Sequence, residues 1–370
     1  MILLVSNTAW SIYNFRQNLV RALLEKNQEV TILAPMDACS TKLSDMGCRV
    51  YDLPLQQHGV NPFADLFLLL TLYHKLRQLR PKFIIFYTIK PNIYGSIAAA
   101  WAGIPCLVVT TGLGYTFINQ NWISRLAHSL FKIALRHPLQ VWFLNYQDLL
   151  AFTKYRLVAP ERAHLLPGEG IDLEHFSPRT NEFIDGTFHF LMIARIIKDK
   201  GVEEYVEAAR RLKNRFSNIT FQLLGNYDTN SPNAISKEQI SEWQHAGIIE
   251  YLGTTDDVRP YIAYADCVVL PSYREGIPRA LIEASAMERP VIATDVPGCR
   301  DAVIDETTGL LCKARNAENL AEICERMAHT TEDMRKKMGQ EGRKFVAKTF
   351  DEKYIVKQYI DILNENKILI

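Results

Sequence analysis

The amino-acid sequence predicts an α/β protein built from two doubly wound parallel sheets. Short apolar runs, such as residues 2–6 and 83–87, alternate along the chain with longer segments of helical periodicity. These runs are apolar throughout, which is typical of strands that helices cover on both faces. The chain has 370 residues. This length is too great for one ordinary core and suits two domains of about 150–200 residues each.

The two halves of the chain repeat the same order of elements. In the first half we expect strands at 2–6, 29–34, 49–53, 83–87, 106–110 and 141–144, and helices at 15–25, 64–79, 94–102 and 122–135. In the second half we expect strands at 188–193, 220–224, 250–252, 267–270 and 290–294, and helices at 201–215, 278–287 and from 317 onward. Turn-forming residues near 175–186 predict a first domain over 1–180 and a second over 181–350. The C-terminal helix, in 351–370, could pack back on the first domain.

Composition excludes several classes of protein. Apolar residues make up 48% and charged residues 22% of the chain, as in ordinary globular proteins. The 7 cysteines are scattered, without a Cys-x-x-Cys pair, which indicates reduced thiols and not a disulfide framework or zinc site. The start of the chain lacks the basic region of a signal peptide, and the longest strongly apolar window, 66–73, falls short of the ~20 residues that span a bilayer. We therefore expect a cytoplasmic protein, soluble or peripheral.

The charges are unevenly distributed. Residues 1–180 hold 17 Lys and Arg against 11 Asp and Glu, a net +6, whereas residues 181–370 hold 25 against 30, a net −5. No acidic residue occurs between Asp65 and Asp148, an interval that contains 8 cations. This pattern predicts an anionic ligand or surface, although chance on a solvated face could also produce it. We find no nucleic-acid-binding motif and expect no nucleic-acid partner.

Two loops of the second half carry the candidate ligand-binding residues. Ligands of doubly wound sheets bind beyond the carboxyl ends of the strands. Arg195 and Lys200 follow the strand 188–193. Two fixed cations suit a diphosphate leaving group, whose charge grows as the sugar–phosphate bond breaks. Both side chains could equally be solvated cations in a turn.

The second loop follows the strand 267–270 and contains a pair of glutamates at its end. Glu275 precedes the next helix and Glu283 lies within it. Carboxylates can accept hydrogen bonds from sugar hydroxyls and from a ribose diol. Two glutamates on a helix surface are common, so the pair alone is weak evidence for a binding site. Its position in a strand–loop–helix segment makes the evidence stronger. The same loop leads through Gly276, Ile277 and Pro278 into a helix whose unpaired N–H groups suit a phosphate.

These segments together resemble family 4 of the retaining glycosyltransferases, which have the GT-B fold of two Rossmann-like domains facing a central cleft. The similarity rests on Arg195 with Lys200-Gly201, on Glu275 with Glu283, on 265–272, and on 290–295 with Gly298 and Gly309. It implies that Arg195 and Lys200 contact the donor diphosphate. It also implies that Glu275 touches the sugar hydroxyls, that Glu283 binds the nucleotide ribose, and that backbone N–H groups from Gly276 onward line the sugar and phosphate.

The first half departs from the family at two points, because the loop 6–16 has no Gly-Gly turn and 87–92 has no histidine. Segments 11–16, 90–95 and 111–117 nevertheless resemble a bacterial subgroup that extends sugars on undecaprenyl diphosphate, one member of which adds N-acetylgalactosamine in α-1,3 linkage. The resemblance implies a UDP-sugar donor and a polyprenyl-diphosphate-linked acceptor. The acceptor-side residues would be Arg16, Lys90, Asn92, Thr111 and Gly112. Each of them could equally cap a helix.

The segment 122–136 has the pattern of a basic amphipathic helix, which is typical of a membrane interface. A helix that packs its apolar stripe on the sheet would have the same pattern. Its position inside the acid-free interval favours docking on the inner leaflet of the cell membrane, together with residues 63–82. The expected membrane contacts are Trp122, Arg125, Lys132 and Arg136.

The sequence therefore predicts a retaining hexosyltransferase that moves N-acetylgalactosamine or a related sugar to a lipid-linked saccharide of a bacterial surface glycan. The expected catalytic residues are Glu275, Arg195 and Lys200, and the departing phosphate takes the proton. We expect no metal or other cofactor, because the family resemblance implies none and the adjacent Asp256 and Asp257 are better placed to cap a helix. Alternatives are a sugar-nucleotide epimerase, a phosphorylase or a non-catalytic partner subunit of the same fold.

Overall fold

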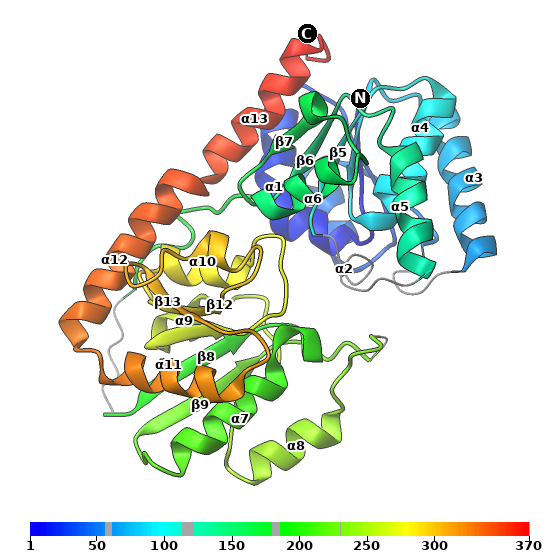
Figure 1. The fold of residues 1–370 in the computed structure, drawn as a ribbon. Coiled ribbons are helices and arrows are strands. Elements are labelled where there is room, and N and C mark those ends of the chain that lie inside the picture. Colours follow the sequence, from blue (N-terminus) through cyan, green and yellow to red (C-terminus); the bar gives the residue numbers. More distant parts are fainter. Residues whose placement is uncertain (56–60, 113–121, 180–185, 230, 370) are drawn as a thin grey trace. The chain divides into compact units, whose positions relative to one another are not determined.

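Two parallel sheets form the framework of the protein, one in each of two units (Figure 1). The computed structural model describes residues 1–55, 61–112, 122–179, 186–229 and 231–369, and for residues 122–127 the backbone alone. The first unit comprises Met1–Gly170 and Glu352–Ile370, and the second comprises Ile171–Asp351.

Among the described residues, the sheet of the first unit has 7 strands in the order β3-β2-β1-β4-β5-β6-β7. The strands are β1 (Ile2–Val5), β2 (Val30–Ala34), β3 (Arg49–Asp52), β4 (Phe83–Tyr87), β5 (Cys106–Thr110), β6 (Gln140–Phe143) and β7 (Ala163–Leu165). Every pair of neighbours is parallel; Leu4, for example, lies opposite Ile32 on one side and Ile85 on the other. The central strands are fully buried, because helices cover both faces of the sheet.

The helices of the first unit are α1 (Ala9–Glu25), α2 (Ala38–Asp45), α3 (Pro62–Leu79), α4 (Ser96–Ala102), α5 (Trp122–Ala134), α6 (Tyr146–Lys154) and α13 (Glu352–Glu365), with short helical turns at Pro91–Gly95 and Pro160–Arg162. Helix α1 begins at Ala9, six positions before the expected start at 15. The Thr8 hydroxyl caps it by accepting a hydrogen bond from the Ser11 N–H (3.1 Å). The polar residues of 6–11 therefore belong to a helix start and not to a long loop.

In the described part of the second unit, the sheet has 6 strands in the order β10-β9-β8-β11-β12-β13, again all parallel. They are β8 (Phe188–Ile193), β9 (Ile219–Leu224), β10 (Glu250–Tyr251), β11 (Cys267–Leu270), β12 (Val291–Thr294) and β13 (Gly309–Cys312). The helices are α7 (Val202–Lys213), α8 (Lys237–His245), α9 (Arg259–Tyr264), α10 (Arg279–Ala286), α11 (Ala317–His329) and α12 (Glu332–Thr349).

Both sheets share the strand order of a Rossmann-like fold. The order runs outward from the first strand of each unit and reverses between β1 and β4 and between β8 and β11. Such reversal points are where doubly wound sheets bind ligands, because adjacent loops leave there on opposite faces. The predicted α/β class with two Rossmann-like domains is confirmed.

The division between the units lies at Gly170–Ile171, ahead of the expected boundary at 180. The Ile171 N–H donates to the Phe350 carbonyl (2.8 Å), so the chain already belongs to the second unit at this point. The turn-forming residues near 177 lie inside that unit. Helix α13 returns to the first unit, where Tyr359 is buried with its ring 4.8 Å from that of Trp142.

Candidate active site

Three loops meet at the carboxyl edge of the second sheet, at its reversal point. They follow β8, β11 and β12. The Tyr273 N–H donates to the Asp199 carbonyl (2.9 Å) and the Glu275 N–H donates to the Pro297 carbonyl (3.2 Å). Backbone hydrogen bonds thus fix the loop that carries Glu275 to both of its neighbours.

Two glycines permit this close approach. Gly201 has φ +75°, and a Cβ there would lie 2.1 Å from the Pro271 carbonyl oxygen. Gly298 has φ +83°, and a Cβ there would lie 2.3 Å from the Glu275 carbonyl oxygen. Only glycine combines a left-handed conformation with no side chain at such distances.

Glu275 and Lys200 form an ion pair at the centre of these loops. Their side chains are only 13% and 18% exposed. The buried Ser272 hydroxyl donates to the same carboxylate oxygen, Oε1 (2.7 Å), and the Thr294 hydroxyl in turn holds the Ser272 carbonyl. The Cys299 thiol lies in the same cluster, where burial and the Glu275 carboxylate raise its pKa. The cluster can therefore bring a positioned carboxylate and an ammonium group to one ligand.

Arg195, the second predicted cation, lies at the start of the same loop as Lys200. Its side chain is 56% exposed, and Nη1 is 3.0 Å from Oδ2 of Asp228. The structure thus pairs Arg195 with Asp228 and Lys200 with Glu275. An exposed guanidinium held by one carboxylate can still turn toward an anion.

Glu283 lies in the second turn of α10, where its Oε1 is 3.1 Å from Nε of Arg279. The preceding residues Gly276, Ile277 and Pro278 form the turn into this helix. Pro278, at the N-cap of α10, offers no side chain that could accept hydrogen bonds from the first N–H groups of the helix. The positive end of the helix dipole therefore lies uncapped, directly after the Glu275 loop. This arrangement suits a negatively charged ligand group.

Two of the predicted acceptor-side residues are buried inside the first unit. Arg16 pairs with Glu169, donates from Nη1 to the Ser11 carbonyl (2.8 Å), and stacks with its guanidinium carbon 3.8 Å from the ring centre of Tyr87. Asn92 donates from Nδ2 to the Val109 carbonyl (3.0 Å). Both residues therefore hold protein groups in place instead of lining an open pocket.

The other three predicted acceptor-side residues are more accessible. Lys90 Nζ is 2.8 Å from Oδ1 of Asp65, and both residues line a cavity of about 290 Å³ beside α3. Thr111 and Gly112 follow β5 and are half-buried. The five residues thus do not converge on one described cavity, and their role in binding an acceptor stays a prediction.

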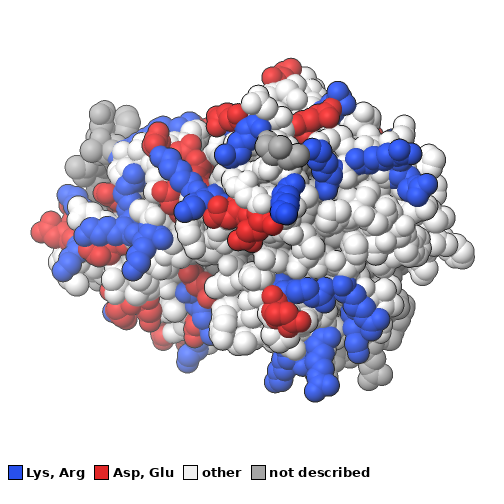
Figure 2. All heavy atoms as spheres, turned by 90° about the horizontal axis from the view of Figure 1, so that it is seen from above, with Lys and Arg blue, Asp and Glu red and all other residues white. Residues whose placement is uncertain are grey.

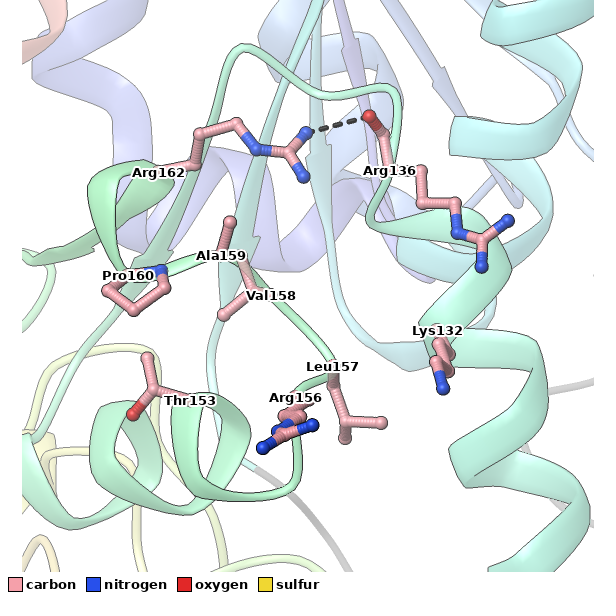
Figure 3. A pocket seen from close by; sticks show the side chains of 9 residues that line it. All are labelled: Lys132, Arg136, Thr153, Arg156, Leu157, Val158, Ala159, Pro160 and Arg162. Atoms are coloured by element: carbon pink, nitrogen blue, oxygen red, sulfur yellow. Dashed lines mark hydrogen bonds between the residues drawn. The ribbon is translucent and has the colours of Figure 1, made fainter.

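The predicted membrane contacts are described in part. Lys132 and Arg136 are exposed at the end of α5 and line a groove (Figure 3). The side chains of Trp122 and Arg125 lie outside the described residues. Within the predicted docking segment 63–82, the structure exposes an apolar ridge on α3 formed by side chains that are 52–86% exposed, namely Phe63, Leu66, Phe67 and Leu70. In the sequence, apolar residues on both faces of that helix indicate that some of them remain exposed.

Asp257 is held by an arginine of its own segment. Its carboxylate accepts hydrogen bonds from the Arg259 N–H (3.0 Å) and from the Arg259 guanidinium (2.7 and 2.8 Å), which lower the pKa of the carboxyl. In the described parts of the chain, no group of three or more His, Cys, Asp or Glu side chains could hold a metal ion.

Comparisons with known proteins assign the family. Residues 14–168 match the family described as Glycosyl transferase 4-like domain, and residues 175–345 match Glycosyl transferases group 1. The chain is 31% identical over 334 residues, 86% of each chain, to N,N'-diacetylbacillosaminyl-diphospho-undecaprenol alpha-1,3-N-acetylgalactosaminyltransferase of Campylobacter jejuni. The chain belongs to the group 1 glycosyltransferases. The prediction of a glycosyltransferase is thereby confirmed.

Other relatives of this glycosyltransferase agree. UDP-Gal:alpha-D-GlcNAc-diphosphoundecaprenol alpha-1,3-galactosyltransferase of Escherichia coli is 24% identical and covers 79% of the chain and 78% of its own length. Among solved structures, sucrose-phosphate synthase of Thermosynechococcus elongatus superposes with a TM-score of 0.82 at 20% identity, covering 99% of both chains. Anabaena HepE in complex with UDP and glucose gives 0.81 at 18% identity, covering 98% of this chain and 99% of its own. These structures confirm the predicted GT-B fold.

Proposed function

We propose that this glycosyltransferase moves a hexose or N-acetylhexosamine from a UDP-sugar to a saccharide linked to undecaprenyl diphosphate, in bacterial surface-glycan assembly. The observation that carries the proposal is the Lys200–Glu275–Ser272 cluster at the reversal point of the second sheet. The relatives named for diphospho-undecaprenol acceptors support the acceptor class. The Campylobacter jejuni relative makes N-acetylgalactosamine the first sugar to test.

The donor would be held by charge and by hydrogen bonds. Lys200 and Arg195 bind the diphosphate, because both are cations of the loop after β8, whose third cation, Lys198, pairs with Glu203. Glu275, positioned by Ser272, accepts hydrogen bonds from the sugar hydroxyls, and Glu283 accepts from the ribose. The N–H groups of Gly276 and Ile277, and those of the first turn of α10 after Pro278, which has none, face the phosphates.

The reaction is a transfer with retention of configuration. The acceptor hydroxyl attacks the anomeric carbon from the side on which UDP leaves, the bond from that carbon to the phosphate oxygen breaks, and the departing phosphate takes the hydroxyl proton. Lys200 and Arg195 stabilise the charge that grows on the diphosphate. In this mechanism the two protein cations neutralise the leaving group, so no metal or other cofactor is required.

The first unit would lie on the anionic inner surface of the cell membrane, where a lipid-linked acceptor resides. The apolar ridge on α3 supports this location, because four large exposed apolar side chains on one helix face suit the acyl boundary. Figure 2 shows Lys and Arg side chains gathered on part of the surface with few acidic side chains beside them. Within the described parts of the chain, no helix combines the length and apolar character of a bilayer span. Such a protein would bind the membrane peripherally.

The test is transfer from a panel of UDP-sugars to an undecaprenyl-diphosphate-linked saccharide in anionic vesicles, with product linkage determined by NMR. We expect one UDP-sugar to dominate, an α-linked product, and equal turnover with and without EDTA. Glu275→Ala should lower turnover at saturating donor by about 100-fold, as for other groups that act on the transition state.

The matched control is Glu318→Ala, which removes a carboxylate that is largely exposed on α11. It should leave turnover unchanged. A β-linked product would refute retention, and near-full activity of Glu275→Ala would refute its catalytic role. Epimerised UDP-sugar without transfer would identify an epimerase instead.

A further inference from the structure

A second candidate binding site lies in the first unit, at the edge of the sheet where β6 and β7 begin. It is a groove of about 500 Å³ between the ends of α5 and α6 and the short helix Pro160–Arg162 (Figure 3). Both β6 and β7 begin at this edge, whereas the loop with Thr111 and Gly112 leaves from the opposite edge of the same sheet. The groove is therefore separate from the predicted acceptor side.

The groove is strongly basic. Its nine lining residues include four cations and no carboxylate, the cations being Lys132, Arg136, Arg156 and Arg162. In the described part of the protein, Lys132, Arg136 and Arg156 form no ion pair. Because like charges at short range repel each other, four cations without a carboxylate among them favour binding of an anion.

One of these cations is fixed by the backbone. Arg162 donates from Nη1 to the carbonyls of Arg136 (2.7 Å) and Pro138 (3.3 Å), as Figure 3 shows for Arg136. Cations in the last turn of a helix, such as Lys132, also offset the helix dipole. That effect does not account for Arg162, which comes from a different segment and reaches back across the groove.

Apolar side chains accompany the cations. The floor is formed by the run Leu157–Pro160, and Ile133 and Tyr155, each 55% exposed, lie next in sequence to Lys132 and Arg156. Aromatic and aliphatic side chains exposed beside cations are typical of membrane interfaces. Ile133 and Tyr155 lie outside the lining of the groove and belong to the surface around it. A soluble anion or a nucleic-acid backbone would gain little from exposed apolar side chains there, so this surface favours a lipid.

We propose that the groove binds the phosphodiester headgroup of an anionic phospholipid. This inference rests on the proposed membrane location and adds a defined site to it. Sequence reasoning assigned Lys132 and Arg136 to general membrane contact, whereas the structure adds Arg156 and Arg162 and a cavity that they share. Binding should therefore depend on the position of the cations and not on net charge alone.

The test is partition of the full-length protein onto vesicles of phosphatidylglycerol and phosphatidylcholine, compared with pure phosphatidylcholine vesicles. The double variant Lys132→Gln/Arg156→Gln should partition about 25-fold less onto the anionic vesicles, at about fivefold per cation removed. Lys26→Gln/Lys154→Gln is the matched control, because both side chains are exposed, lie in the same unit and are outside the groove. It should change partition less than about twofold.

A second comparison separates headgroup binding from apolar insertion. Phe63→Ser/Phe67→Ser, on the α3 ridge, should weaken binding to both kinds of vesicle and keep the preference for phosphatidylglycerol. The groove variant should lose that preference. Unchanged melting temperature and UDP affinity would show that each variant is folded.

Several outcomes would overturn the proposal. If the groove variant and its matched control lose vesicle partition equally, binding depends on the overall positive charge of the unit and not on the groove. Displacement from vesicles by millimolar inorganic phosphate at constant ionic strength would mean a soluble-anion site. Loss of duplex-DNA binding with unchanged vesicle binding would mean a nucleic-acid site. The partition assay contains neither donor nor acceptor, so its failure is distinct from a failure of the proposed transfer reaction.

Discussion

At the scale of single residues, the proposed active site depends on one ion pair. Lys200 and Glu275 neutralise each other while Ser272 holds the carboxylate. A donor diphosphate would compete with the Glu275 carboxylate for the Lys200 ammonium, whereas the sugar needs that carboxylate for its hydroxyls. Lys200, proposed to bind the diphosphate, and Glu275, proposed to bind the sugar, therefore affect each other's binding.

This competition predicts opposite effects of Glu275→Gln on binding and on catalysis. Removing the negative charge leaves the Lys200 ammonium to the diphosphate, so UDP should bind about three- to tenfold more tightly. Transfer should fall by about 100-fold, because a neutral amide orients the sugar and stabilises the transition state less well. Titration calorimetry with UDP and steady-state transfer rates would measure the two effects.

Glu318→Gln, on the exposed face of α11, should leave both quantities unchanged. Weaker binding of UDP to Glu275→Gln would contradict competition. It would show instead that Glu275 positions Lys200 for the diphosphate.

At the scale of elements, the site depends on loops that pack without side chains between them. Gly298→Ala should impose about 1–3 kcal/mol of backbone strain at φ +83° and push the new methyl group against the Glu275 carbonyl. The Glu275 loop must then move, so UDP affinity should fall at least tenfold. Urea unfolding and UDP titration would measure both losses.

Gly247→Ala is the control for strain alone. Gly247 also has a left-handed conformation, at φ +68°, but a Cβ at this position would meet no atom within 4 Å. The Gly247→Ala variant should lose stability by a similar strain energy and keep its UDP affinity. Equal losses of affinity in the two variants would contradict a local role for Gly298.

The sequence predicted some elements to the residue and others poorly. Phe83–Tyr87, Cys106–Thr110 and Cys267–Leu270 agree with the expected strands, because continuous apolar runs between polar turns leave little choice. The strands β7 and β13 were missed, because β7 has only three residues with His164 at its centre and β13 begins with Gly309, and glycine is depleted in strands. The candidate donor residues Arg195, Lys200 and Glu275 could be predicted, because each follows a predicted strand and precedes a predicted helix. The ion pair of Arg16 with Glu169 could not, because its partners lie 153 positions apart.

At the scale of the whole molecule, the two units have the same sheet order and different surface chemistry. The proposed donor-binding cluster belongs to the second unit, and the α3 ridge and the basic groove belong to the first. The expected boundary at 180 rested on turn-forming residues such as Ser177 and Pro178. These residues lie inside the second unit, which begins at Ile171. The return of α13 to the first unit rests on the packing of Tyr359, which composition alone does not reveal.

A property of both units is that all seven cysteines are buried thiols that are not joined in disulfides. Burial raises the pKa of Cys48, in the first unit, to about 11 and that of Cys312, in the second, to about 12, from an ordinary value of 9.0. Burial likewise raises the pKa of Tyr87 to about 12 from 10.0. Each of these groups keeps its proton in the folded protein at a pH where the unfolded chain loses it.

The sign of the resulting pH dependence follows from proton counting. Below pH 9 both states hold these protons and the free energy of unfolding does not depend on them. Above pH 9 for the two thiols, and above pH 10 for Tyr87, the unfolded chain binds fewer protons, so stability should fall by about 1.4 kcal/mol per pH unit for each group. Melting temperatures measured from pH 7 to 11 should be level at first and then decline. Cys48→Ala should make the decline shallower, and a melting temperature that stays level to pH 11 would contradict the burial of these groups.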